Sequence, residues 1–234
     1  MTSVCTLIVI AKEPVPGRVK TRLTPPFSPD AAAELAEAAI GDTLAAVLAA
    51  VPRARSRGLD VRPVLVLDGA GGPWLDDTLE APLDIPTIPQ RAGGLDIRLA
   101  GAFQDATQAI GADAALLIGM DTPQVTAGML VEAMEQLLSA GCASVLGHAE
   151  DGGWWALGLR QPDPELLLGV PMSTPHTGAD QESRLVEAGL SVSLLRRLRD
   201  VDTAADAEQV AAALPRSRFA VALHRLRPAS LGYA

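Results

Sequence analysis

The chain has 234 residues, of which 48% are hydrophobic and only 3% aromatic, so its core must consist mainly of Ala, Leu and Val. This length suits one domain of the larger kind. A formal net charge of -9 argues against general binding to nucleic acid or to an anionic membrane, because both need a basic face.

The cysteines and the N-terminus bear on the cellular compartment. Cys5 and Cys142 stand outside any CxxC or metal-like cluster, so we expect reduced core residues, with a disulfide or a catalytic thiol as the alternatives. The N-terminal apolar run is about six residues long, too short for a signal peptide or a membrane span. We therefore expect a cytoplasmic protein.

Strands and helices are predicted to alternate along the chain. Taken in order, strands are expected at 7–11, 61–67, 85–88, 114–119, 143–146, 154–159 and 190–195, and helices at 30–51, 74–79, 97–110, 126–138, 203–214 and 217–226. This alternation predicts an α/β fold of three layers, with a mostly parallel sheet and helices on both faces. We expect one domain over residues 1–226 and a loose tail at 227–234.

A basic loop follows the first predicted strand. Residues 12–22 hold four cations, Lys12, Arg18, Lys20 and Arg22, against a single anion, and two prolines and a glycine stiffen the segment. Open α/β sheets bind ligands at the carboxyl ends of their strands, so the loop is predicted to bind the phosphates of a nucleotide. The alternative is a solvated surface loop. The spacing is not that of a P-loop.

Asp121 directly follows the buried strand at 114–119, in the segment LLIGMDTPQV. A carboxylate at that point projects into the same crevice as the basic loop. Because one carboxylate together with substrate phosphates commonly holds Mg²⁺, we interpret Asp121 as a metal ligand. An ordinary turn residue before proline is the alternative.

A turn with two glycines precedes the strand at 154–159. Asp151, Gly152 and Gly153 can form a simple hairpin turn, but glycines also let backbone approach a ligand closely. Trp154 then offers an aromatic wall, and core packing is expected for one of the paired tryptophans. We include all four residues in the predicted substrate site.

Further polar residues are candidates for the same site. Asp202 precedes Thr203, which with Asp206 resembles a capping box, and Asp202 is a possible second metal ligand. The polar segment with Gln90, Gly94 and Arg98 is a candidate for reading a base or a substrate. Thr177 belongs to a hydroxyl-rich loop of the kind that closes over a ligand.

Four segments occur in a recognisable order: AKEPVPGRVKTRL, GMDTP, EDGGWWALGL and DVDTAADAE. Together they resemble an uncharacterised bacterial family of glycosyltransferase-A-like (GT-A) proteins, which is related to the molybdenum-cofactor and deazaflavin-cofactor guanylyltransferases. The resemblance covers about residues 7–210. It implies a Rossmann-like nucleotide-diphospho-sugar transferase sheet, phosphate binding by Lys12, Arg18 and Lys20, and metal binding by Asp121 and Asp202.

The leading hypothesis is a Mg²⁺- or Mn²⁺-dependent transferase that uses a nucleoside triphosphate or a nucleotide-sugar and a small-molecule acceptor. Lys12, Arg18, Lys20 and Asp121 form its expected catalytic centre, and Arg22 lies in the substrate site. A non-catalytic nucleotide-binding module on the same fold is the second hypothesis, and an interaction scaffold is the third. Neither nucleic acid nor a membrane is an expected partner.

Overall fold

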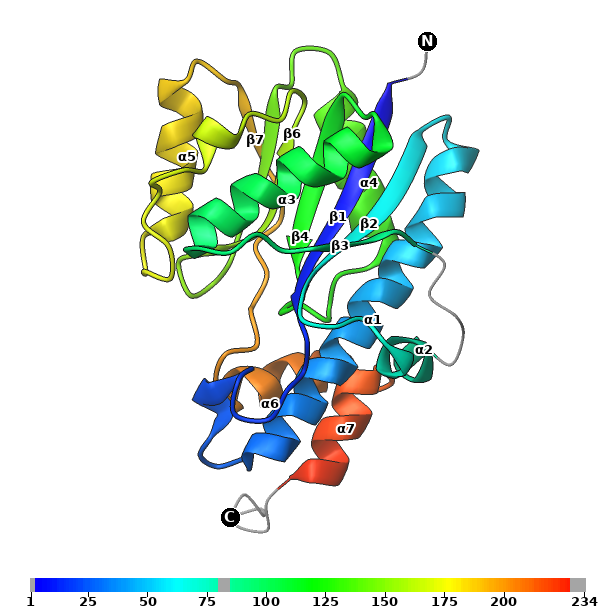
Figure 1. The fold of residues 1–234 in the computed structure, drawn as a ribbon, viewed down its shortest axis with the longest axis vertical. Coiled ribbons are helices and arrows are strands. Elements are labelled where there is room, and N and C mark those ends of the chain that lie inside the picture. The colour runs from blue at the N-terminus through cyan, green and yellow to red at the C-terminus, as the bar shows by residue number, and fades with distance from the viewer. Residues whose placement is uncertain (1–2, 80–84, 228–234) are drawn as a thin grey trace.

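The computed structural model describes residues 3–79 and 85–227, which form a central sheet covered by helices (Figure 1). The sheet has seven strands in the order β3-β2-β1-β4-β6-β5-β7. In chain order the strands are β1 (Val4–Lys12), β2 (Asp60–Asp68), β3 (Thr87–Pro89), β4 (Ala114–Gly119), β5 (Ser144–His148), β6 (Trp154–Leu159) and β7 (Val192–Leu194). The predicted tail lies, apart from residue 227, outside the described residues.

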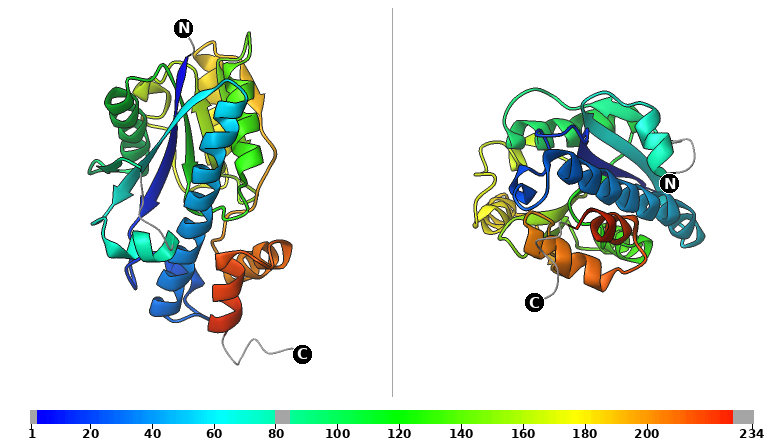
Figure 2. Two further views of the ribbon diagram at one scale, coloured as in Figure 1. Left: turned by 90° about the vertical axis from the view of Figure 1, so that its right-hand side faces the viewer. Right: turned by 90° about the horizontal axis from the view of Figure 1, so that it is seen from below.

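Helices lie on both faces of the sheet, as Figure 2 shows. The helices are α1 (Pro29–Ser56), α2 (Pro73–Leu79), α3 (Leu95–Ile110), α4 (Ala127–Leu138), α5 (Thr177–Glu187), α6 (Ala204–Ala213) and α7 (Arg218–Leu226), with 3-10 turns η1 (Thr21–Leu23) and η2 (Pro164–Leu166). Helices α1 and α4 pack against the face of β1 that carries Leu7 and Val9, and α3 packs against the face that carries Ile8. The three-layer α/β prediction is confirmed.

The central strand β1 is buried on both faces because its apolar residues alternate between the two core layers. It pairs in parallel with β2 on one side and with β4 on the other. Among the described strands, β6 alone runs antiparallel to its neighbours, β4 and β5. After β1 the chain forms β2 and β3 on one side of that strand, and then forms β4 on its other side. The strand order therefore reverses between β1 and β4, and open sheets bind ligands at such a point.

A helical lobe extends beyond the carboxyl edge of the sheet. It consists of η1, the N-terminal half of α1, α6 and α7, and it is the lower part of the molecule in Figure 1. Its own apolar cluster is centred on Leu23, Phe27, Leu35 and Phe219. Because α1 runs from the lobe along the sheet, it joins both parts. The prediction of one domain stays a prediction.

Helix α1 is longer than its sequence predicts. Ser28 caps it by accepting from the backbone N–H of Ala31 at 3.1 Å. The helix then continues past Pro52 to Ser56, although proline normally disfavours a helix interior. Ala50 and Ala54 on either side are fully buried, so tertiary packing outweighs the local cost.

Helix α1 is also the one helix among the described residues whose length and composition would suit a membrane span, with a mean hydropathy of 1.5 over its most apolar window. Half of that window is buried, as in the core helix of a soluble protein, so this is weak evidence for a span. A cytoplasmic location stays a prediction. Cys5 and Cys142 are free and buried, as expected of core cysteines.

Helix α5 was not predicted, because residues 173–180 read as a loop. Its sequence, TGADQESRLVE, is mostly polar, so it does not stand out as a helix that covers an apolar core. Leu185 is fully buried, and the buried amide of Gln181 donates to the carbonyl of Leu166 at 2.8 Å. The helix therefore depends on a contact with Leu166, which lies outside the helix and precedes it in the chain. Thr177, expected in a loop, is the first residue of this helix.

Candidate functional site

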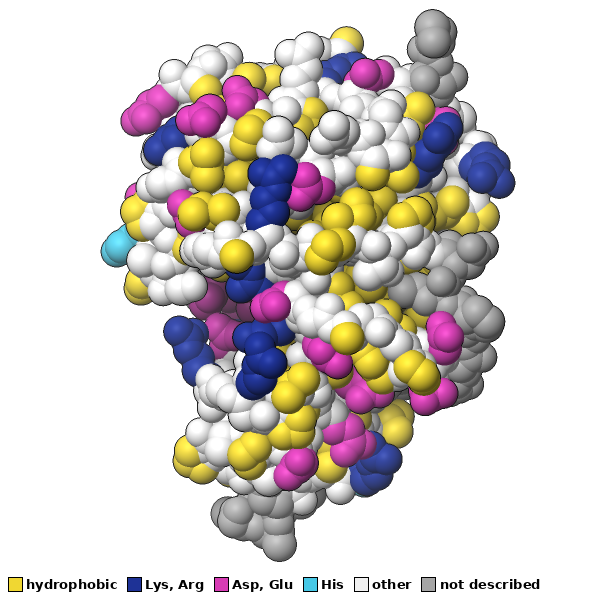
Figure 3. Space-filling view, viewed as in Figure 1, with side chains coloured by type: hydrophobic (Ala, Val, Ile, Leu, Met, Phe, Trp, Pro, Cys, Tyr) yellow, Lys and Arg dark blue, Asp and Glu magenta, His cyan; other side chains and the backbone are white. Residues whose placement is uncertain are grey.

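A cavity of about 600 Å³ lies between the carboxyl edge of the sheet and the helical lobe. Figure 3 shows the opening, with dark-blue cations at its rim and magenta acids behind them. Its charged lining residues are Lys12, Arg18, Lys20, Arg22, Arg98, Asp121, Asp151, Asp200 and Asp202. Its large apolar lining residues include Leu95, Leu99, Leu117, Trp154 and Met172.

The basic loop turns its cations toward this cavity. Val19 and Leu23 are buried and anchor the loop at its far end. The one anion, Glu13, faces away, because its Oε2 accepts from the backbone N–H of Ala70 at 2.9 Å. The cations of the loop are thus not neutralised by their own neighbour in the chain.

Lys20 joins the loop to the acids that come from far downstream in the chain. Its Nζ lies 2.6 Å from Oδ1 of Asp121 and 3.2 Å from Oδ1 of Asp202, and its side chain is only 7% exposed. Burial lowers the pKa of Lys20, but the two neighbouring carboxylates outweigh burial and raise that pKa above its usual value. Arg22, which is exposed, contacts the other oxygen of Asp202 at 3.1 Å.

Asp200 stands two residues before Asp202 in the same acidic segment, and the sequence assigned a metal role only to Asp202. Burial, helped by the nearby charges of Asp121 and Asp151, raises the pKa of Asp200 to about 8. Its Oδ1 is buried and has no hydrogen-bond partner among the described residues. The signal that could have found it is its spacing: in an extended segment, residues two apart share a side, so Asp200 and Asp202 face the same cavity.

These carboxylates suit a hard divalent cation. Among the described residues no three His, Cys, Asp or Glu side chains form a ready-made metal cluster. Mg²⁺, however, usually binds one or two carboxylates together with substrate phosphates rather than an all-protein cage. Asp121 and Asp202 already share one cation, the Lys20 ammonium, and Asp200 has a free oxygen nearby. The donor set therefore fits such an ion.

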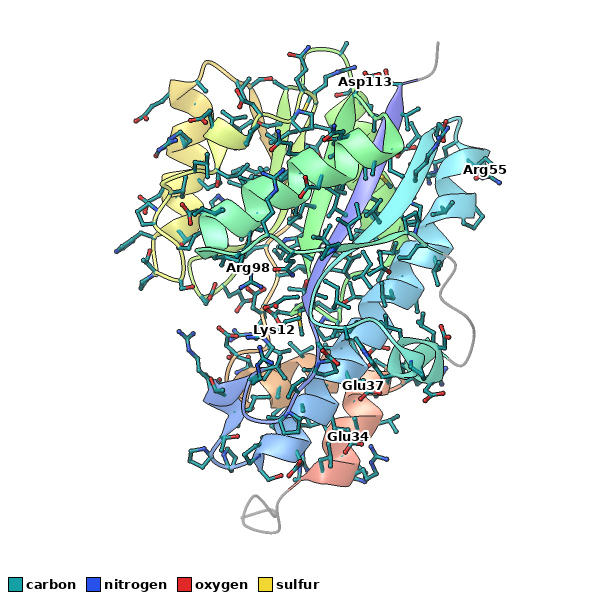
Figure 4. All side chains as sticks on the ribbon, in the orientation of Figure 1. Lys12, Glu34, Glu37, Arg55, Arg98 and Asp113 are labelled. Atoms are coloured by element: carbon teal, nitrogen blue, oxygen red, sulfur yellow. The ribbon has the colours of Figure 1, made fainter. Side chains whose placement is uncertain are left out.

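Gln90 and Arg98 line the cavity beside the carboxyl ends of β1 and β2. Gln90 donates both amide hydrogens to backbone carbonyls, to Ala11 at 2.6 Å and to Val66 at 3.2 Å. Its Oε1 accepts from Nε of Arg98 at 2.7 Å, and Asp68 accepts from Nη2 of Arg98 at 3.1 Å. Figure 4 shows Arg98 above Lys12 in that view. The side chain of Gln90 thus joins Arg98 to the end of β1, and both residues line the cavity.

The turn after β5 and the segment before α5 close one side of the cavity. Asp151 and Gly153 line it, and Oδ1 of Asp151 accepts from the backbone N–H of Gly153 at 2.8 Å. Thr177 also lines the cavity, but its hydroxyl donates to the carbonyl of Pro171 at 2.9 Å. Trp154 is only partly buried, whereas Trp155 is buried and donates to the carbonyl of Arg196 at 3.0 Å.

Two predicted substrate contacts do not line the cavity. Gly94 is the residue that caps α3. Gly152 packs against the backbone of Pro175, and its carbonyl accepts from the N–H of Gly178 at 2.8 Å. The substrate contacts expected at Gly94 and Gly152 stay predictions, and in the structure these two glycines shape the chain around the cavity. The capping box of Thr203 and Asp206 is confirmed.

Sheet order, the one antiparallel strand and the position of the cavity define an α/β protein with the nucleotide-diphospho-sugar transferase fold. A protein from Desulfovibrio desulfuricans G20, provisionally assigned as a nucleotide-diphospho-sugar transferase, superposes with a TM-score of 0.79 at 24% sequence identity, covering 96% of this chain and 95% of that one. The GT-A-like fold implied by the sequence motifs is thereby confirmed.

Two more distant structures share the fold. CMP:2-keto-3-deoxy-manno-octonic acid synthetase, complexed with CTP, has a TM-score of 0.55 at 13% identity over 92% of this chain and 99% of that one. The Rv0371c protein of Mycobacterium tuberculosis H37Rv, in complex with manganese, has a TM-score of 0.50 at 20% identity over 89% and 98% of the two chains. At these identities the likeness shows the fold alone.

The chain belongs to the family described as "Uncharacterized protein conserved in bacteria (DUF2064)", whose profile matches residues 47–174. No curated protein matches the sequence at a significant level. The expected membership of a bacterial GT-A-like family is confirmed, whereas the relation to the cofactor guanylyltransferases stays a prediction.

Proposed function

We propose that the protein is a transferase that depends on Mg²⁺ or Mn²⁺ and acts on a nucleoside triphosphate or a nucleotide-sugar. One observation carries this proposal: Lys20 of the basic loop lies 2.6 Å from Asp121, so the cations and the distant acids meet in one cavity. That cavity lies at the carboxyl ends of β1 and β4, where the strand order reverses. The CTP and the manganese in the two distant structures agree with this assignment.

In this proposal the chain mainly positions and neutralises the diphosphate. Lys12, Arg18 and Lys20 bind its oxygens, because ammonium and guanidinium groups form charge-assisted hydrogen bonds with phosphate. Asp121 and Asp202 hold the divalent ion, with Asp200 beside them. When bound, the ion neutralises charge that develops on the leaving phosphates.

The remaining cavity residues orient the two substrates. Arg98 contacts the nucleotide or the acceptor from its place beside the carboxyl ends of β1 and β2, and Gln90 acts as a positioning residue for Arg98. Arg22, Asp151, Gly153, Trp154 and Thr177 complete the substrate site. The attacking acceptor then displaces pyrophosphate from a nucleoside triphosphate, or a nucleoside diphosphate from a nucleotide-sugar.

The first test is a thermal-shift screen of nucleotides and nucleotide-sugars, with and without Mg²⁺ or Mn²⁺. A ligand at 100 times its Kd should stabilise the folded protein by about 2.7 kcal/mol. Ligands that bind are then incubated with the protein and candidate acceptors. Release of pyrophosphate indicates nucleotidyl transfer, and release of a nucleoside diphosphate indicates glycosyl transfer. Saturable binding with no turnover would instead favour the non-catalytic module.

A matched pair of variants tests the acids. Asp121→Asn should lower kcat/KM by about 100-fold or more, as expected when a group that supports charge stabilisation is removed. Asp113→Asn is the control, because Asp113 precedes the opposite end of the same strand, as Figure 4 shows, and it should leave turnover unchanged. Metal-dependent turnover that survives Asp121→Asn would contradict the proposed site.

A further inference from the structure

The position that a divalent ion needs is already taken by a side chain of this protein. Nζ of Lys20 contacts carboxylate oxygens of both Asp121 and Asp202, at 2.6 and 3.2 Å. These are the two aspartates to which the proposed function assigns the ion. A divalent ion binds carboxylate oxygens at about 2.0 to 2.6 Å, so an ammonium held on the same oxygens competes with it through the repulsion of two positive charges at short range.

We propose that Lys20 is a tethered cation that occupies the ion position in the ligand-free protein and leaves it when a phosphate-bearing substrate enters the cavity. The inference rests on the proposed function, and it adds the order in which Lys20, the substrate and the ion occupy the site. Bare Mg²⁺ or Mn²⁺ competes with Lys20 and binds weakly. The substrate phosphates attract the Lys20 ammonium, so the ion and the substrate bind with positive coupling, and each strengthens the binding of the other.

The side chain of Lys20 can move while its backbone stays in place. Val19 before it is buried, and the backbone N–H of Leu23 donates to the Lys20 carbonyl at 2.9 Å. The Lys20 backbone is in the left-handed region, with φ of 49°, a conformation that persists for a non-glycine residue only where its surroundings hold it. A lysine side chain has a flexible four-carbon stem, and here it opens onto a cavity of about 600 Å³.

The phosphates that the other cations of the loop bind would also attract the released Lys20 ammonium. Lys12 and Arg18 line the same cavity as Lys20, so phosphate oxygens that these two cations bind lie in the same cavity as that ammonium. Arg22 does not share this arrangement. It contacts Asp202 at 3.1 Å, but its side chain is 67% exposed and has no recorded contact with Asp121. Arg22 is therefore a natural control for the loss of a nearby positive charge.

The experiment measures the affinity for Mn²⁺ alone, from the paramagnetic resonance signal of free Mn²⁺, in the full chain without nucleotide. Lys20→Met should tighten Mn²⁺ binding by about tenfold or more, because it removes the competing charge from two carboxylates at once. Lys20→Gly should do the same and suits the left-handed backbone. Arg22→Met should change the affinity by no more than about threefold, as expected of an exposed ion pair.

Two results overturn the inference. If Lys20→Met and Lys20→Gly bind Mn²⁺ no more tightly than the wild type, Lys20 does not compete with the ion. If Arg22→Met tightens binding as much as they do, the effect is general electrostatics and the bridging geometry is irrelevant. Either result leaves the proposed function standing, provided that the wild type binds Mn²⁺. If neither the wild type nor any variant binds Mn²⁺, with or without nucleotide, the proposed function fails and the inference fails with it.

Discussion

Gly152 shows how a single residue shapes the cavity without facing it. Its φ is +93°, in the region that favours glycine, and a Cβ at this position would lie 1.9 Å from the carbonyl oxygen of Pro175. The turn after β5 and the segment before α5 therefore pack backbone against backbone. Both carry lining residues, Asp151 and Thr177, so the close approach sets the width of that side of the cavity.

Gly152→Ala should destabilise the protein by about 1 to 3 kcal/mol more than Gly169→Ala, because only the first adds an overpacking cost to the backbone strain. Gly169 is the matched control, since its φ is +76° and a Cβ there would meet nothing within 4 Å. Urea unfolding of both variants measures the difference. Equal losses of stability would show that the contact with Pro175 is unimportant.

The contacts of Lys20 and Gln90 illustrate what residue-level prediction could and could not reach. The sequence predicts that Lys20 and Asp121 share a crevice, because both follow the carboxyl ends of neighbouring parallel strands. It does not predict their 2.6 Å contact. It also does not predict that the amide of Gln90 donates to the carbonyls of Ala11 and Val66. Those contacts depend on how distant segments pack, and hydrogen-bond geometry changes within fractions of an ångström.

At the scale of elements, the attachment of α7 to α1 holds the helical lobe together. The carboxylate of Asp42 on α1 accepts from the backbone N–H groups of Arg218 and Phe219, at 3.0 and 2.9 Å. These N–H groups belong to the first turn of α7 and have no partner within their own helix. Ser217 caps the same turn by accepting from the N–H of Ala220 at 3.0 Å.

Asp42→Ala should lower the free energy of unfolding by about 1 to 3 kcal/mol, because it leaves two partly buried donors without an acceptor. Asp42→Asn keeps one side-chain oxygen and should cost less. Chemical denaturation of the two variants measures the loss of unfolding free energy in each. A loss from Asp42→Asn that equals the loss from Asp42→Ala would mean that the negative charge, not the hydrogen bonds, holds α7.

Elements rich in apolar residues or opened by a recognisable cap were predictable, and the polar helix α5 was not. Strands β4 and β6 match their predicted ranges, 114–119 and 154–159, because each is a short apolar run bounded by polar or glycine residues. Helix α5 is stabilised by contacts of Gln181 and Leu185 that no local pattern reveals. Helix α1 passes Pro52 because burial beyond it outweighs the proline.

At the scale of the whole molecule, the cavity joins two separately packed parts. Lys12 and Asp121 come from the carboxyl edge of the sheet, whereas Arg22 and Asp202 come from segments that lead into the helical lobe. The backbone N–H of Val201 donates to the carbonyl of Asp121 at 2.9 Å and is one of the direct links between the two sides. A ligand in the cavity would add a further link.

Nucleotide together with Mn²⁺ should slow amide hydrogen exchange on both sides of the cavity, in residues 12–23 and in residues 198–203, because a bound ligand raises the free energy of local opening on each side that it contacts. Mass spectrometry of peptides from the two segments, with and without ligand, measures this. Protection limited to one side would show that the ligand does not bridge the sheet and the lobe.

The sequence by itself determined the α/β class, most of the strands and the group of charged residues that meets at the sheet edge. It could do so because hydrophobic periods and the ends of buried strands are local properties of the chain. Only the tertiary structure decided that Lys20 lies between Asp121 and Asp202, that Asp200 is buried beside them, and that Glu13 and Gln90 turn away to other partners. These outcomes depend on the packing of segments up to about 180 residues apart in the chain, whose distances no local pattern records.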